Sequence, residues 1–184
     1  MPYTFDYLVF IGRFQPFHLA HMQTIKIALE QSENVILALG SAQNERNTKN
    51  PFLAAEREEM ILSNFSEAHQ KRIHFVHVID VYNDVKWVQL VKKLVNHVVT
   101  PDAKVGLIGH FKDDSSYYLQ LFPEWEMVEL DSLQDAMSAT PVREAYYRGE
   151  ILEQAFPLGT SDFLHKFQQL VTSSNTKNVN IIPF

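Results

Sequence analysis

The sequence predicts an α/β protein with a doubly wound, Rossmann-like parallel sheet of about five strands and helices on both faces. Short runs of β-branched and aromatic residues alternate with longer stretches of helical period, a pattern typical of βαβ units. Glycines follow three of the expected strands, at Gly12, Gly40 and Gly109. A glycine there lets backbone approach a ligand, or serves only the turn.

The expected strands are short and apolar, and they cover residues 7–11, 34–39, 73–81, 104–108 and 125–130. Apolar residues three and four apart predict the helices between them and two more at the end of the chain. These helices cover residues 19–31, 54–65, 85–98, 115–122, 141–148 and 162–171. In such a fold, ligands bind beyond the carboxyl ends of the strands, where the strand order reverses.

The length of the chain favours a single domain. Its 184 residues are 46% hydrophobic, which is enough for one core, and we expect the domain to span residues 1–171. Residues 172–178 are polar without periodicity. We therefore expect 172–184 to be a polar linker or C-terminal tail.

Charge and composition argue against several classes of protein. The formal net charge is −6, whereas a protein that binds nucleic acid through its phosphates usually has an excess of basic residues. The chain has no cysteine, so it has no disulfide framework and no thiolate zinc site. Without an apolar run of about 18 residues or a basic, apolar leader, we expect no membrane partner and a cytoplasmic location.

The first chemical motif is a strand, a glycine, an arginine and a proline-braced turn that leads to His18 and His21. Histidines three apart share one helix face, and a helix N-terminus attracts anions. The two imidazoles are therefore suited to donate hydrogen bonds to phosphate. The alternative is that His18 and His21 are ordinary polar residues on the surface. A zinc site is disfavoured, because no H-E-x-x-H spacing is present.

This motif, Gly12-Arg13-Phe14-Gln15-Pro16-Phe17-His18-Leu19-Ala20-His21, resembles the G-R-F-Q-P-F-H-x-G-H signature of archaeal-type nicotinamide mononucleotide adenylyltransferases, within the nucleotidylyltransferase superfamily. It departs from the signature at Ala20, where the family has glycine. The resemblance implies catalytic roles for Arg13, His18 and His21. It also implies that Gly12, Phe14 and Gln15 bind the phosphates of ATP.

A second motif is Met137-Ser138-Ala139-Thr140-Pro141-Val142-Arg143. By itself it predicts a helix start, with Thr140 as N-cap and Pro141 in the first position. It is similar to the superfamily pattern I-S-S-T-x-x-R, from which it departs at Met137 and Ala139. The resemblance implies that Ser138 and Thr140 bind phosphate and that Arg143 is catalytic.

The segment from Gly40 to Arg57 resembles the family's G-S-A-Q…N-P-F…E-R segment, in which a loop arginine approaches the phosphates. That arginine is Arg46 here. Arg57 follows on the next helix, where it could instead pair with Glu56 or Glu58 on a solvated face.

After the third strand the family has an asparagine and a tryptophan that contact the nicotinamide end of the substrate, and Asn83 and Trp87 fit them. An indole can stack on a pyridinium for roughly 0.5 to 2 kcal/mol, and an amide can read the carboxamide. The alternative is that Trp87 belongs to the core, beside Val85 and Val88.

The segment from Gly106 to Tyr118 resembles G-H-x-K-D-x-S-S-Y-Y of the bacterial branch, in which this domain is fused to a Nudix hydrolase. It implies that Gly109 binds ATP. The resemblance covers about residues 7–150, and because no Nudix signature occurs in the sequence, we expect that domain to be absent.

The resemblance implies a nucleotidyltransferase that moves the adenylyl group of ATP to nicotinamide mononucleotide, forming NAD and pyrophosphate. The attacking phosphate is already an anion, so positioning and charge stabilisation replace a general base. We expect Mg²⁺ to arrive with ATP and no metal site of the protein's own, and a homo-oligomer is one assembly left open. Two alternative functions also remain open: transfer of an adenylyl or cytidylyl group to another phosphate acceptor, and a catalytically idle nucleotide sensor. A dehydrogenase is disfavoured, since no G-x-G-x-x-G follows the first strand.

Overall fold

The computed structural model describes residues 3–110, 114–130 and 139–176. The chain folds as two compact units. The sheet unit comprises Met1–Arg13, Gln23–Gln43 and Glu67–Ala136, and the helical unit comprises Phe14–Met22, Asn44–Ser66 and Met137–Phe184. The chain thus passes from the sheet unit to the helical unit within the histidine motif, after Arg13.

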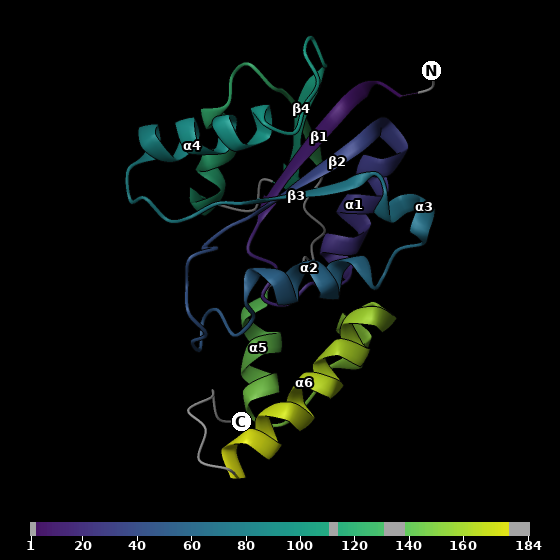
Figure 1. Ribbon diagram of the computed structural model, residues 1–184, viewed down its shortest axis with the longest axis vertical. Coiled ribbons are helices and arrows are strands. Elements are labelled where there is room, and N and C mark those ends of the chain that lie inside the picture. Colours follow the sequence, from purple (N-terminus) through teal and green to yellow (C-terminus); the bar gives the residue numbers. More distant parts are fainter. Residues whose placement is uncertain (1–2, 111–113, 131–138, 177–184) are drawn as a thin grey trace. The chain divides into compact units, whose positions relative to one another are not determined.

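The sheet has five parallel strands in the order β3-β2-β1-β4-β5 (Figure 1). They are β1 (Phe5–Gly12), β2 (Ser32–Leu39), β3 (Ile73–His77), β4 (Val105–His110) and β5 (Glu126–Leu130). The order reverses beside β1, where the chain moves from one half of the sheet to the other. This is the doubly wound sheet that the alternation of strand and helix predicted.

Helices cover both faces of this sheet. On one face, Val88, Val91 and Val95 of α4 (Asp84–Asn96) form one core with Val9 and Leu107 of the strands. Leu119 of the 3₁₀ helix η1 (Asp114–Leu121) joins the same core. On the other face lies α1 (Leu19–Gln31), whose Thr24 Oγ1 is 3.1 Å from His110 Nε2. His110 points away from Leu107 because side chains alternate along a strand.

The helical unit packs around aromatic side chains. It contains α2 (Ala54–Leu62), α5 (Ala139–Tyr147) and α6 (Leu158–Thr176). Phe52 lies edge-on to Phe163 and Phe167 of α6, with ring centroids 5.9 and 5.1 Å apart. Tyr146 of α5 donates to the Leu164 carbonyl oxygen at 3.2 Å. These contacts join α5, α6 and the loop before α2.

Several boundaries differ from those predicted. β3 ends at His77, and α2 ends at Leu62. Two short elements were not predicted, α3 (Glu67–Gln70) and the 3₁₀ helix η2 (Glu153–Ala155). Helix α6 extends to Thr176, so the predicted tail is wrong for 172–176, where the backbone is helical. Residues 160–176 contain no glycine or proline to stop the helix.

No helix in the described part of the chain combines the length and the apolar character needed to cross a membrane.

Candidate active site

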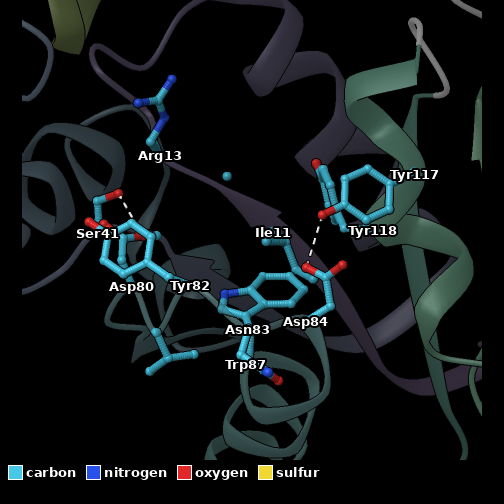
Figure 2. A pocket seen from close by; sticks show the side chains of 13 residues that line it. Ile11, Arg13, Ser41, Asp80, Tyr82, Asn83, Asp84, Trp87, Tyr117 and Tyr118 are labelled. Atoms are coloured by element: carbon cyan, nitrogen blue, oxygen red, sulfur yellow. Dashed lines mark hydrogen bonds between the residues drawn. The ribbon is translucent and has the colours of Figure 1, made fainter.

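A cavity of about 400 Å³ opens at the carboxyl ends of β1, β2 and β3 in the sheet unit (Figure 2). It brings together four predicted site residues: Gly12, Arg13, Asn83 and Trp87. The other lining residues are Ile11, Gly40, Ser41, Asp80, Val81, Tyr82, Asp84, Tyr117 and Tyr118. The cavity therefore lies where a doubly wound sheet binds its ligands.

Gly40 leaves space for the Arg13 side chain. A Cβ atom at Gly40 would lie 3.3 Å from Arg13 Cγ, and the Gly40 N–H donates to the Gly12 carbonyl oxygen at 2.9 Å. The two loops that follow β1 and β2 are joined at this point. A glycine after β2 is thus explained by the close approach of an arginine rather than by its turn.

Hydrogen bonds of Asp80 connect the loop after β3 to the loop after β2. Its carboxylate accepts from Ser41 Oγ and from Gln43 Nε2, both at 3.1 Å. Gln43 Oε1 in turn accepts from the Asp80 N–H at 3.1 Å. Ser41 and Tyr82 have φ angles of 51° and 48°, in the left-handed region that non-glycine residues seldom adopt. Asp80 was not predicted as a site residue, because its carboxylate lies within the strand predicted over residues 73–81, whereas β3 ends at His77.

Trp87 contributes both to the core and to the cavity, so the two interpretations of this residue do not exclude each other. Its half-buried indole packs edge-on against Tyr118 at 5.9 Å and against Phe122 at 5.8 Å, between ring centroids. Figure 2 shows the indole at the centre of the lining side chains. Tyr118 and Phe122 fix the orientation of the indole, which therefore offers a rigid surface for stacking.

Asn83 forms the N-cap of α4. Its Oδ1 accepts from the Lys86 N–H at 3.0 Å, which satisfies one of the unpaired amides at the helix start. This bond orients the side chain and leaves the NH₂ group as the part of the amide suited to a ligand.

Asp84, the next residue, accepts a hydrogen bond from Tyr117 Oη at 2.9 Å. The bond to Asp84 and the charge of that carboxylate raise the pKa of Tyr117. Tyr117 is therefore a hydroxyl donor at neutral pH.

The helical unit holds the two histidines of the first motif. Their rings are stacked with centroids 3.7 Å apart and planes at 17°. The His18 N–H donates to His21 Nδ1 at 3.2 Å, and Phe14 meets the His21 ring edge-on at 4.8 Å. Because Nδ1 of His21 accepts, the neutral ring carries its proton on Nε2. The geometry thus presets His21 as a donor through Nε2.

Gln15 is buried, and its amide is occupied by backbone. Nε2 donates to the Phe52 carbonyl oxygen at 2.9 Å, and Oε1 accepts from the Phe52 N–H at 3.0 Å. The Phe14 side chain is also buried. The Gln15 side chain thus joins the turn to residue 52. The binding of phosphate by Phe14 and Gln15 stays a prediction, one that their backbone groups would have to fulfil.

Arg143 is only 8% exposed. It donates to the Gln15 carbonyl oxygen at 2.9 Å and to Thr140 Oγ1 at 3.4 Å. The structure thus brings both family motifs together at Gln15. Helix α5 already includes Ala139, so Thr140 lies in its first turn and was wrongly predicted as the N-cap. Ser138 lies outside the described residues.

Arg46 forms a two-pronged ion pair with Glu56. Its two terminal nitrogens lie 2.9 and 3.0 Å from the Glu56 carboxylate oxygens. One of them also donates to the Pro51 carbonyl oxygen at 2.7 Å, and the guanidinium lies over the Phe167 ring at 4.7 Å. Arg57 lies on the buried face of α2 with 1% exposure, so the alternative that placed it on a solvated face is wrong.

Gly109 lies inside β4 rather than after it, in register with Glu129 of β5. A Cβ atom there would come within 3.3 Å of Leu119. The structure gives this glycine a packing role against Leu119 of η1, and its contact with ATP stays a prediction.

A family model with the description "cytidylyltransferase-like" matches residues 9–174. The chain belongs to this family. A relative in Acinetobacter baylyi, named nicotinamide/nicotinic acid mononucleotide adenylyltransferase, is 70% identical over 90% of this chain and 88% of its own length. A nicotinamide-nucleotide adenylyltransferase of Thermococcus onnurineus is 30% identical over 87% of this chain and 82% of its own.

The fold of this cytidylyltransferase-like protein also matches a solved structure. A bifunctional NMN adenylyltransferase/ADP ribose pyrophosphatase from Francisella tularensis aligns with a TM-score of 0.81 and 34% identity, over 94% of this chain and 54% of that one. A second structure of the Francisella protein, complexed with AMP and a manganese ion, aligns with a TM-score of 0.80. The chain spans about half the length of that protein. The resemblance inferred from the motifs is confirmed.

Within the described residues, no three histidine or carboxylate side chains of this cytidylyltransferase-like chain are grouped to hold a metal ion. The sheet unit presents an aromatic surface, an amide donor and Arg13, a set that can bind a flat cationic ring. The helical unit, by itself, presents imidazoles and arginines, which can stabilise negative charge on phosphate.

Proposed function

We propose that this chain transfers the adenylyl group of ATP to nicotinamide mononucleotide, forming NAD and pyrophosphate. The observation that carries the proposal is the cavity at the carboxyl ends of the strands, which Arg13, Asn83 and Trp87 line together. The 70% identity to a nicotinamide/nicotinic acid mononucleotide adenylyltransferase supports it.

The cavity suits the acceptor. A pyridinium ring stacks on the Trp87 indole, which Tyr118 and Phe122 hold from behind. The NH₂ group of Asn83 donates to the carboxamide oxygen of the substrate, while its Oδ1 stays on the Lys86 amide. Arg13, the one cation among the described lining residues, binds the 5′-phosphate.

The adenylyl donor is bound by the groups around the turn at 14–18. His21 donates through Nε2 to the phosphates, with His18 stacked beside it. Arg143, placed by Gln15 and Thr140, adds positive charge. A divalent ion enters with ATP; we propose Mg²⁺, and the Francisella structure, which is complexed with AMP and a manganese ion, supports the use of such an ion.

In the reaction, an oxygen of the 5′-phosphate forms a bond to the α-phosphorus of ATP, and the bond from that phosphorus to the pyrophosphate oxygen breaks. No proton moves, since both phosphates are anions. Negative charge grows on the leaving pyrophosphate. Preset donors and cations that meet this charge lower the barrier without reorganisation.

The deciding experiment is incubation with ATP, Mg²⁺ and nicotinamide mononucleotide, followed by assay of NAD and pyrophosphate. We expect both products in equal amounts. The variant His21→Ala should retain its circular dichroism spectrum and lose about 10²- to 10³-fold in kcat, the usual cost of removing one transition-state donor. Unchanged NAD synthesis in this variant would rule out the role of His21, and no NAD from the wild type would rule out the function.

A further inference from the structure

We propose that Tyr147 is a positioning residue for the ATP site: its hydroxyl holds the loop at 44–53 against α5, which keeps Arg46 in place for the phosphates. This role rests on the proposed function, and all the residues that carry it belong to the helical unit. Tyr147 contacts neither substrate. It acts through the backbone of the loop and through Arg46.

The Tyr147 hydroxyl is bound to the backbone of this loop. It donates to the Thr48 carbonyl oxygen at 2.6 Å and lies 3.4 Å from the Asn47 carbonyl oxygen. Burial of the ring raises the pKa of Tyr147 to about 12, so the hydroxyl keeps its hydrogen at neutral pH. The end of α5 is thereby joined to a segment that lies far away in the sequence.

The turn that Tyr147 holds is also fixed within itself. Asn47 Oδ1 accepts from the N–H groups of Lys49 and Asn50, both at 2.9 Å. The Asn47 N–H donates to the Asn50 carbonyl oxygen at 3.1 Å, and Asn50 is buried. Because residues 47–50 are bonded to one another, one hydrogen bond at Thr48 positions the whole turn. Arg46 directly precedes this turn.

Two sets of contacts hold the loop, and only one of them can survive when Arg46 binds phosphate. Arg46 is bound to the Glu56 carboxylate and lies over the Phe167 ring, and it must leave this carboxylate to meet ATP. The bond from Tyr147 involves backbone and no charge, so the nucleotide does not compete for it. The loop therefore stays against α5 while only the arginine side chain turns.

Helix α5 connects this loop to a second arginine. Arg143 lies four residues before Tyr147, so the two side chains share one face of the helix. Arg143 donates to the Gln15 carbonyl oxygen, in the turn that leads to the histidines. One face of α5 thus presents a cation proposed to meet the phosphates and a hydroxyl that holds the loop with the other cation, Arg46.

Tyr146, the preceding residue, provides a matched control. Its hydroxyl donates to the Leu164 carbonyl oxygen of α6 at 3.2 Å, so it joins two helices and does not hold the loop. Tyr146→Phe and Tyr147→Phe each remove one hydroxyl that binds a backbone carbonyl oxygen of the helical unit. Tyr147 is only half-buried, and phenylalanine fits in its place.

The first experiment measures the dissociation constant of ATP with Mg²⁺ by calorimetry, and KM and kcat by NAD formation. Tyr147→Phe should raise both the dissociation constant and the KM for ATP about two- to fivefold, because ATP must then order a loop that was ordered before. The kcat at saturating ATP should stay the same. Tyr146→Phe should lower the melting temperature and leave the affinity for ATP unchanged.

A second measurement follows the loop by limited proteolysis. Trypsin cleaves after lysine, and Lys49 is exposed within the loop. In Tyr147→Phe without ATP, cleavage after Lys49 should be about two- to fivefold faster, because the loop leaves α5 more often. Tyr146→Phe should be cleaved there at the rate of the wild type.

The variant Arg46→Gln tests whether Tyr147 acts through Arg46. In this background, Tyr147→Phe should no longer change the dissociation constant of ATP, since the loop has no cation left to place. An equal effect of Tyr147→Phe with and without Arg46 would overturn the proposed role.

The outcomes separate this role from the proposed function. A wild type that binds ATP but makes no NAD refutes the function, while calorimetry and proteolysis still decide the role of Tyr147. An unchanged affinity for ATP in Tyr147→Phe overturns that role alone, even if the loop is cleaved faster. A wild type that does not bind ATP refutes both.

Discussion

Gly106 is a residue for which space, rather than backbone conformation, requires glycine. It lies in β4 opposite Glu126, and a Cβ atom there would come within 2.9 Å of the Glu126 carbonyl oxygen and of a Leu8 methyl group. A backbone carbonyl in a sheet cannot move aside. We expect Gly106→Ala to lower the free energy of unfolding by about 1 to 3 kcal/mol, measured by urea denaturation.

Gly149 supplies the control for this prediction. Its φ is +84°, and nothing lies within 4 Å of an added Cβ atom. Gly149→Ala should therefore cost only the backbone strain, about 1 to 2 kcal/mol, and Gly149→Asn less. If Gly106→Ala proves as stable as the wild type, the close packing of β4 against β5 and β1 is wrong.

At the scale of single residues, the sequence predicted those cavity residues that combine an unusual side chain with a position after a predicted strand. Arg13, Asn83 and Trp87 line one cavity as expected. The hydrogen bonds of the Gln15 side chain were not predicted, because their partner, Phe52, is distant along the chain. The role of Asp80 was missed for the same reason. Its carboxylate connects two loops only because the fold brings the donors, Ser41 and Gln43, close to it.

Asn83, the N-cap of helix α4, has two proposed roles, and different substitutions can separate them. Asn83 caps the helix through Oδ1, whereas its NH₂ group is proposed to meet the substrate. Serine is an equally good N-cap but has no amide. We expect Asn83→Ser to keep the melting temperature and raise the KM for nicotinamide mononucleotide. Asn83→Ala should raise that KM and also lose about 1 kcal/mol of stability.

Thermal unfolding and steady-state kinetics on the same preparations test this separation. A loss of stability in Asn83→Ser equal to that in Asn83→Ala would mean that the cap depends on more than the Oδ1 acceptor. An unchanged KM in both variants would remove Asn83 from the acceptor site.

The loop before α2 holds Arg46 against Glu56 and over Phe167. If Arg46 serves the phosphates of ATP, it must exchange this carboxylate for them. Glu56→Gln retains an oxygen acceptor for the Leu53 N–H, which Glu56 now binds at 2.8 Å, but it removes the competing charge. We therefore expect a lower KM for ATP in Glu56→Gln, by about two- to fivefold.

Arg46→Gln is the counterpart and should raise the KM for ATP. A lower ATP affinity in both variants would mean that the ion pair itself, rather than the released arginine, is what the nucleotide needs.

At the scale of elements, periodicity predicted all five strands and the main helices, but not their ends. Helix α6 was cut short because polar residues after 171 were interpreted as a tail, although side-chain polarity does not stop a helix without a breaker. The third strand was predicted too long because Val78 and Val81 are apolar. Such ends are set by tertiary contacts that a local pattern does not contain.

For the whole molecule, the sequence predicted a parallel sheet but not its strand order, which depends on which crossover goes to which side. The division into two units was also beyond its reach. The helical unit is assembled from three separate segments of the chain, so no linker or change in composition marks its limits. Linkers and changes in composition mark the boundary of a domain only when that domain is one continuous segment of the chain.

Binding of ATP should be visible as a stabilisation of the folded chain. A ligand at 100 times its dissociation constant adds about 2.7 kcal/mol to the free energy of unfolding. For a chain of this size, each kcal/mol raises the melting temperature by about 2 to 4 °C. We therefore expect saturating ATP with Mg²⁺ to raise it by about 5 to 11 °C in differential scanning fluorimetry. Adenosine at the same concentration is the control, and it should give a smaller shift because the proposed cations and imidazoles bind phosphate. An equal shift with adenosine would show that the phosphates contribute nothing, and would contradict the roles of Arg143 and His21.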